Sequence, residues 1–108
     1  MKPKKWEIWM ASFAFEDDPN IKKDRPVIVL ENNGVFPILT AKITKHPPRD
    51  GYWGEYQIVK WAEAGLSNPS TIRLSKRLKL IESDFRIKKG ILQPIDILAI
   101  QALIKENS

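Results

Sequence analysis

Residues 23–32, KDRPVIVLEN, join three charged residues to a fully apolar run that predicts a strand. The five residues 26–30 are all apolar, which is typical of a strand that is buried on both faces and therefore central in a sheet. Asp24 and Arg25 come directly before that strand. Two interpretations of Arg25 follow. It is either a solvated loop residue paired with Asp24, or a cation aimed at an anionic group.

The chain before this stretch predicts a first strand and a long loop. Trp6, Ile8 and Met10 alternate with other residues, as expected of a strand. Residues 15–24, FEDDPNIKKD, are polar and contain a proline, which predicts a loop of about ten residues. Asp17 and Asp18 are expected to be solvated turn residues within it.

The chain after residues 23–32 predicts further strands separated by turns. Asn32, Asn33 and Gly34 form a turn signal. Strands are predicted over residues 35–44, 55–61 and 71–75, with 78–81 extending the sheet. Between the first two, KHPPRDGYWG (residues 45–54) predicts a second long loop, since its prolines and glycines oppose regular structure.

A terminal helix is predicted from Pro94 to about Lys105. Proline is favoured in the first helical turn, and Asp96 suits the positive end of the helix dipole. Only Asp96, Gln101 and Lys105 interrupt an otherwise apolar circumference, which consists of Ile95, Ile97, Leu98, Ile100, Ala102, Leu103 and Ile104. Such a helix needs more burial than one face of a sheet provides, so we expect a homodimer.

Taken together, these elements predict one domain over residues 1–108 that is mainly β (α+β): a small, bent antiparallel sheet or partial barrel with a C-terminal α-helix. The chain has 43% hydrophobic and 29% charged residues, which favours a folded rather than a disordered protein. No cysteine is present, which excludes disulfides and thiol chemistry and fits the cytoplasm. No stretch approaches the roughly 18 apolar residues that span a bilayer, so no membrane partner is expected.

The net charge of +5 has an uneven distribution along the chain. Residues 70–90 hold seven basic side chains against two acidic ones; the basic ones are Arg73, Lys76, Arg77, Lys79, Arg86, Lys88 and Lys89. A basic patch suits a nucleic acid or an acidic protein segment.

The side chains available exclude several kinds of catalysis. The chain has one histidine, no cysteine and no carboxylate pair at ligand spacing, so neither a metal site nor a cofactor is expected. It also has no nucleophile elbow and no glycine loop for phosphates. Cationic, hydroxyl and imidazole groups remain. They suit attack of an RNA 2′-hydroxyl on the neighbouring phosphate, because the substrate itself supplies that nucleophile.

In such a reaction, Arg25 would stabilise charge on the phosphate and Thr44 would hydrogen-bond a phosphate oxygen. His46 lies two residues beyond Thr44 and is the candidate acid or base. The plain alternatives are a surface arginine, an ordinary strand-end threonine and a solvated histidine. Tyr52 and Trp53 either stack on unpaired bases or pack onto their own domain.

Five motifs in order resemble the MazF/PemK family of toxin–antitoxin ribonucleases. They are WEIWMASF (6–13), RPVIVLENN (25–33), LTAKIT (39–44), AGLSNPSTIRL (64–74) and KKGILQPIDILAIQALI (88–104). The resemblance implies an SH3-like barrel with a C-terminal helix, and a homodimer that binds single-stranded RNA in a groove near its interface. It further implies cleavage without a metal, leaving a 2′,3′-cyclic phosphate and a 5′-hydroxyl, and inhibition by a cognate acidic antitoxin.

By this resemblance, Arg25 and Thr44 fall on the catalytic positions of the family, and Arg73 on a further basic position. The RNA-binding residues are expected to be Lys42, Arg73, Ser75 and Trp53. Pro26 is predicted to fix the backbone so that Arg25 projects into the groove instead of joining the sheet.

The sequence departs from the family pattern in three ways. Asp24 replaces the usual glycine before Arg-Pro, Ser75 replaces the catalytic aspartate of some members, and the first loop lacks the histidine that some members use. Two alternatives therefore stay open: a non-catalytic inhibitor on the same fold, like the related gyrase poisons, and a degenerate nucleic-acid-binding module. A non-catalytic inhibitor of that kind would act through its C-terminus, but residues 104–108, IKENS, contain no aromatic residue. The pair of Arg25 and Thr44 favours cleavage instead.

Overall fold

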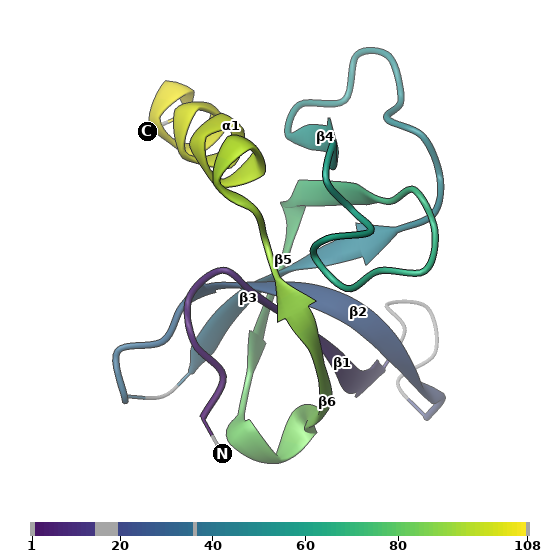
Figure 1. Cartoon of the computed structure of the whole chain (residues 1–108). Helices are drawn as coiled ribbons and strands as arrows, with labels where there is room; N and C mark the ends of the chain where they lie inside the picture. The colour runs from purple at the N-terminus through teal and green to yellow at the C-terminus, as the bar shows by residue number, and fades with distance from the viewer. Residues whose placement is uncertain (1, 15–19, 36, 108) are drawn as a thin grey trace.

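The computed structural model describes residues 2–14, 20–35 and 37–107. These residues form six strands and a C-terminal helix (Figure 1): β1 (Glu7–Ala14), β2 (Lys22–Glu31), β3 (Ile38–Thr44), β4 (Glu55–Gln57), β5 (Thr71–Leu80), β6 (Phe85–Ile91) and α1 (Pro94–Glu106). A short 3-10 helix, η1 (Glu82–Asp84), connects β5 to β6. No helix in the described part of the chain is long and apolar enough to cross a membrane.

The strands form one antiparallel sheet in the order β4-β5-β3-β2-β1-β6. The apolar run that predicted a central strand lies in β2, where residues 27–30 are buried between β1 and β3. The predicted fold, a mainly antiparallel sheet followed by a C-terminal helix, is confirmed.

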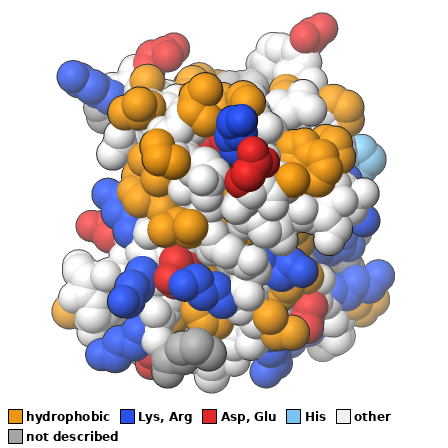
Figure 2. Space-filling view, in the orientation of Figure 1, with side chains coloured by type: hydrophobic (Ala, Val, Ile, Leu, Met, Phe, Trp, Pro, Cys, Tyr) orange, Lys and Arg blue, Asp and Glu red, His pale blue; other side chains and the backbone are white. Residues whose placement is uncertain are grey.

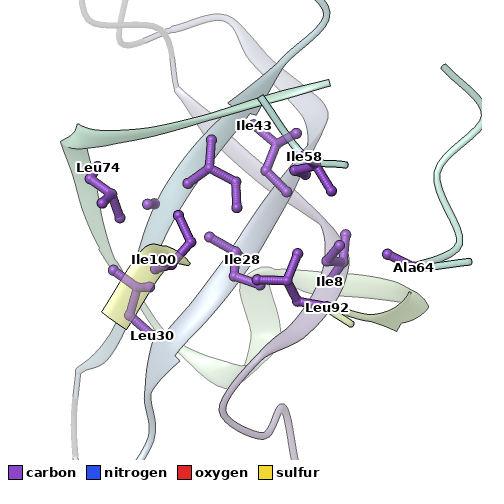
Figure 3. Close-up of a cluster of buried hydrophobic side chains, with 11 residues drawn as sticks. Ile8, Ile28, Leu30, Ile43, Ile58, Ala64, Leu74, Leu92 and Ile100 are labelled. Atoms are coloured by element: carbon purple, nitrogen blue, oxygen red, sulfur yellow. The ribbon is translucent and has the colours of Figure 1, made fainter. Parts of the chain in front are cut away.

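The main core lies between one face of the sheet and α1. Figure 3 shows strand residues such as Ile8, Ile28 and Leu74 meeting Ile100 of α1 and Leu92. Side chains alternate along a strand, so the neighbours of these residues point to the opposite face. There a smaller cluster forms, made of Ala11, Phe13, Val27 and Leu80. Each large side chain that is fully buried contributes about 1.5–3 kcal/mol.

Helix α1 extends over the predicted residues and one more, but its faces are unequal. Ile100 is buried and Ile97 packs against the main core. In contrast, Ile95 is 53% exposed and Leu98 is 67% exposed. Figure 2 shows hydrophobic side chains gathered over α1 at the upper left, whereas lysine and arginine side chains gather lower on the same view.

Four strands differ in extent from the predictions: β2, β3 and β5, and also β4, which is described below. β2 begins at Lys22, so the last residues of the predicted first loop belong to a strand; Asp17 and Asp18 lie outside the described residues. β3 begins at Ile38 rather than at residue 35. Residues 71–75 and 78–81 were predicted separately, but β5 is one strand over Thr71–Leu80. Its pairing with β3 omits residues 74–76, and this irregularity hid the continuity.

β4 ends at Gln57, although a strand to residue 61 was predicted. The cause is Asp96, which was expected to interrupt the apolar surface of the helix and is instead fully buried. Its carboxylate accepts hydrogen bonds from the backbone N–H groups of Val59 and Lys60, at 2.8 and 2.9 Å. Those groups are therefore turned toward α1 and do not continue a sheet ladder.

β6 was not predicted at all. Its pairing with β1 skips Arg86 and Lys89, so it contains two irregularities within seven residues. Each extra residue shifts the alternation of apolar and polar side chains by one position. The period of two by which a strand is recognised is therefore lost from this part of the sequence.

Candidate RNA-binding groove

The register of the sheet brings Arg25 and Thr44 together. The ladder between β2 and β3 pairs Val27 with Lys42 and stops there. Continuing the same register by two residues places Arg25 opposite Thr44, just beyond the end of that ladder. On its other side β2 still pairs with β1, where Arg25 lies opposite Ala11.

Arg25 is therefore part of the sheet, and the prediction that Pro26 keeps it out of the sheet is wrong. Pro26 lies opposite Met10 of β1, beyond the part of β2 that pairs with β3. A proline is tolerated at such a one-sided position because its missing N–H removes no hydrogen bond to the second neighbour. The side chain of Arg25 is exposed.

Two adjoining pockets share Arg25, Ile43 and Thr44. The small pocket has a volume of about 160 Å³ and is also lined by Phe13, Lys42 and Arg73. The large pocket has a volume of about 450 Å³ and extends past His46 to the 66–70 loop and β6. We call the two pockets together the Arg25–Thr44 groove.

Three cationic side chains line the small pocket. Arg25, Lys42 and Arg73 come from three different strands, and the Nζ atom of Lys42 lies 5.8 Å from the centre of the Phe13 ring. Cations gathered from separate strands create a strongly positive local potential. The small pocket is therefore suited to an anionic group such as a phosphate.

A hydrogen bond at the end of β3 orients the side chain of Thr44. Its Oγ1 atom accepts a hydrogen bond of 3.3 Å from the backbone N–H of His46. A hydroxyl that accepts through one lone pair still has a proton to donate. Thr44 can thus donate to a ligand oxygen in the groove, and His46 lines the same large pocket.

Arg73 has an acidic neighbour on the side away from Lys42. Glu55 lies opposite Arg73 in the pairing of β4 with β5, and its side chain is 1% exposed. Hydrogen bonds from Arg49 hold the pKa of Glu55 below its ordinary value, although burial alone would raise it. The Nε atom of Arg73 is 3.6 Å from Glu55 Oε2, which is beyond hydrogen-bond distance, so the two interact chiefly through their charges.

A close backbone contact at two glycines, Gly65 and Gly90, positions one side of the large pocket. A Cβ atom on Gly90 would lie 2.1 Å from the carbonyl oxygen of Ala64, and one on Gly65 would lie 2.0 Å from that of Lys89. The backbone before the 66–70 loop therefore rests directly on β6. This contact brings Asn68 of the loop and Lys89 of β6 into the same pocket.

Sequence reasoning did not single out Lys89 or the loop residues Ser67, Asn68 and Ser70 for the groove. Lys89 appeared in the basic stretch 70–90 and in the motif KKGILQPIDILAIQALI, and the loop appeared in the motif AGLSNPSTIRL. None of these patterns shows that the two segments touch, because that contact depends on Gly65 and Gly90 lying face to face.

Two of the predicted RNA-binding residues lie elsewhere. Trp53 is half-buried and packs against the main core. Ser75 is exposed but lines neither pocket, because it belongs to the residues that the β3–β5 pairing omits. Within residues 2–14, 20–35 and 37–107, no three His, Cys, Asp or Glu side chains gather in a group that could hold a metal ion.

A third pocket, also about 450 Å³ in volume, lies near the opposite ends of β2 and β3, against the C-terminal half of α1. Its lining includes Trp6, Leu30, Leu39 and Ile104, together with Lys5, Arg77 and Lys105. Among the described residues that line it there is no serine, threonine or histidine. The Arg25–Thr44 groove is therefore the better candidate for chemistry on a phosphate.

Comparison with known proteins agrees with the fold. The family model described as PemK-like, MazF-like toxin of type II toxin–antitoxin system matches residues 4–107. The chain is also similar in structure to the Mycobacterium tuberculosis toxin MazF-mt6, with a TM-score of 0.69 and 21% sequence identity over 93% of each chain. A search of curated proteins finds no match. At 21% identity the structural likeness establishes the fold, and the family match extends over nearly the whole chain, so this chain belongs to the family of PemK-like, MazF-like toxins of type II toxin–antitoxin systems.

Proposed function

We propose that this toxin is a metal-independent, sequence-selective endoribonuclease that cleaves single-stranded RNA. The observation that carries the proposal is the small pocket, which Arg25, Lys42 and Arg73 line together with Thr44. Cations and a hydroxyl around one small hollow suit a phosphate on which negative charge increases during reaction.

The proposed reaction is an internal transfer within the RNA. The 2′-hydroxyl oxygen bonds to the adjacent phosphorus while the bond from phosphorus to the 5′ oxygen breaks, leaving a 2′,3′-cyclic phosphate and a 5′-hydroxyl. A base removes the proton of the 2′-hydroxyl, and an acid protonates the departing 5′ oxygen. His46, which lines the large pocket beside Thr44, is assigned one of these two proton transfers.

The protein groups have separate tasks in this scheme. Arg25 can present two N–H donors to two phosphoryl oxygens at once, because its guanidinium group is planar. Thr44 donates one hydrogen bond to the same phosphate. Lys42 and Arg73 add positive charge, and this charge takes the place of a metal ion in stabilising the transition state.

We further propose that the toxin is a cytoplasmic homodimer. The support for a dimer is a set of exposed apolar side chains on α1 and at the end of β6, where Ile91 is 47%, Ile95 53% and Leu98 67% exposed. Contiguous apolar side chains of this kind mark interaction sites. A second copy of the chain would cover them in a two-fold symmetric contact.

A cognate antitoxin completes the proposal. The net charge of +5 and the cations of the groove favour an acidic segment, whose carboxylates would occupy the positions of RNA phosphates. RNA and antitoxin would then compete for the Arg25–Thr44 groove.

The test is incubation of the purified protein with mixed-sequence RNA in the presence of EDTA, followed by analysis of the new ends. Cleavage with 2′,3′-cyclic phosphate and 5′-hydroxyl ends is the expected result. A requirement for magnesium would refute the mechanism. Binding of RNA without any cleavage would instead support the degenerate binding module, and absence of both would support the non-catalytic inhibitor.

A further inference from the structure

The β3–β4 loop carries an arginine–tyrosine stack that the proposed reaction does not use. In this loop, drawn beside β4 at the upper right of Figure 1, the Cζ atom of Arg49 lies 3.7 Å from the centre of the Tyr52 ring. Tyr52 is nevertheless 56% exposed. We propose that this stack is a binding platform for one unpaired RNA base beside the cleaved phosphate, an inference that rests on the proposed function.

The arginine of the stack is held in one orientation. Its Nε and Nη2 atoms both donate to Oε2 of Glu55, and its backbone N–H donates to Oε1 at 2.9 Å. The Glu55 side chain is 1% exposed, and its pKa is lowered by these hydrogen bonds. A buried, ionised carboxylate that accepts from two N–H groups of one guanidinium fixes the plane of that group.

The loop backbone fixes the tyrosine in turn. Gly51 and Gly54 have positive φ angles of 79° and 84°, which glycine adopts without strain. Tyr52 lies between them, and its N–H donates to the carbonyl of Arg49 at 3.3 Å. The carbonyl of Gly54 accepts a 2.9 Å hydrogen bond from the N–H of Leu74, which attaches the loop to β5.

The platform adjoins the groove through a row of charges. Lys42 and Arg73 are paired across β3 and β5, and Arg73 and Glu55 across β5 and β4. Glu55 then binds Arg49. The guanidinium of Arg73, which lines the small pocket, is therefore separated from the stack only by Glu55.

Physical reasons favour a base as the occupant. An immobilised aromatic ring that is more than half exposed offers apolar area without the entropic cost of ordering it on binding. Bases of single-stranded RNA stack on such rings, and a guanidinium behind the ring adds a cation–π contribution. The surrounding cations would hold the phosphates on either side of the stacked base.

The test uses fully 2′-O-methylated single-stranded RNA, which cannot undergo attack by a 2′-hydroxyl and so reports binding alone. Its sequence is the one that the wild type cleaves in the mixed pool, or a mixed sequence if none is cleaved. Tyr52→Leu, which keeps bulk without an aromatic face, should weaken binding by about 5- to 150-fold, the fold-change that corresponds to one base–aromatic stack. Tyr52→Phe should bind like the wild type.

The matched control is Val35→Ala, which removes an exposed apolar side chain beyond the opposite end of β3 and should leave binding unchanged. Equal melting temperatures of all variants would show that the changes are local. A scan in which single bases are removed from the RNA gives the decisive comparison. The wild type should lose affinity at one position, and Tyr52→Leu should lose none there.

The outcomes separate this proposal from the proposed function. If the wild type binds and cleaves RNA but Tyr52→Leu binds equally well, the platform is refuted and the ribonuclease stands. If the base-removal scan gives the same profile for both proteins, the platform is also refuted. If the wild type binds no RNA, both proposals fail together.

Discussion

Asp96→Asn tests the contact that connects α1 to residues 56–60, in and just after β4. Asp96 is fully buried in the first turn of α1. Its Oδ1 atom accepts from the Tyr56 hydroxyl and the Val59 N–H, and its Oδ2 atom accepts from the Lys60 N–H. Burial and the hydrogen bond to Asp96 raise the pKa of Tyr56 well above its ordinary value of 10.0, so the phenol keeps the proton that it donates.

The magnitude follows from the three hydrogen bonds. Asparagine keeps one acceptor oxygen for Tyr56 and Val59, but places an NH₂ group against the N–H of Lys60, where two donors then face each other. A hydrogen bond to a charged group contributes about 1.5–3 kcal/mol, so the expected loss is about 2–3 kcal/mol. For a chain of this length, about 4 °C of melting temperature corresponds to each kcal/mol, which gives a decrease of roughly 10 °C.

Thermal unfolding followed by circular dichroism measures this change. Tyr56→Phe removes one of the three donors and should lower the melting temperature by about half as much. Asp50→Asn makes the same chemical change at an exposed loop position and serves as the control. If Asp96→Asn melts within about 2 °C of Asp50→Asn, the reasoning on the buried carboxylate is refuted.

Three further predictions concern other parts of the structure. Because the folded pKa of Glu55 lies below its ordinary value of 4.5, its stabilisation is present above about that pH and is lost as the pH falls through the lowered pKa. Glu55→Gln should thus be less stable than the wild type in denaturant at pH 7, with a smaller difference at pH 3; a constant difference would contradict the ion pair. Gly90→Ala should lower stability by about 1–3 kcal/mol or more, since a Cβ atom there would lie 2.1 Å from the carbonyl oxygen of Ala64. Gly51→Ala, where only the positive φ opposes the change, should lower stability by about 1–2 kcal/mol. If Gly51→Ala lost as much stability as Gly90→Ala or more, the close contact between Gly90 and Ala64 would be contradicted. Leu98→Glu should convert the proposed dimer to a 12.5 kDa monomer in sedimentation. A wild type that already sediments at that mass would refute the proposed dimer.

The parts of the fold that could be predicted are those with a strong local pattern. The apolar residues 26–30 indicated a central strand, and Pro94 with its apolar successors indicated the helix; both are confirmed. β6 could not be predicted, because two irregularities shift its alternation within seven residues. The burial of Asp96 could not be predicted either, because its partners lie about 40 residues earlier in the chain.

The candidate site follows the same division. The sequence predicted that Arg25 and Thr44 act on the same phosphate, but only the register of β2 and β3 shows how the fold brings them to one pocket. Lys89 joins them through a backbone contact between two glycines, for which a single sequence contains no signal. The catalytic roles of Arg25 and Thr44 stay predictions until they are measured.

The most direct test of the proposed function is the rate of RNA cleavage by Arg25→Ala, measured beside RNA binding and melting temperature. If Arg25 stabilises charge on the transferring phosphate, cleavage should fall by roughly 10²- to 10³-fold. Binding should fall far less, because Lys42 and Arg73 remain in the small pocket. Arg25→Lys should recover only part of the rate, since it retains the charge but not the planar fork. Cleavage by Arg25→Ala at the wild-type rate would contradict the account and make Arg25 an ordinary surface residue.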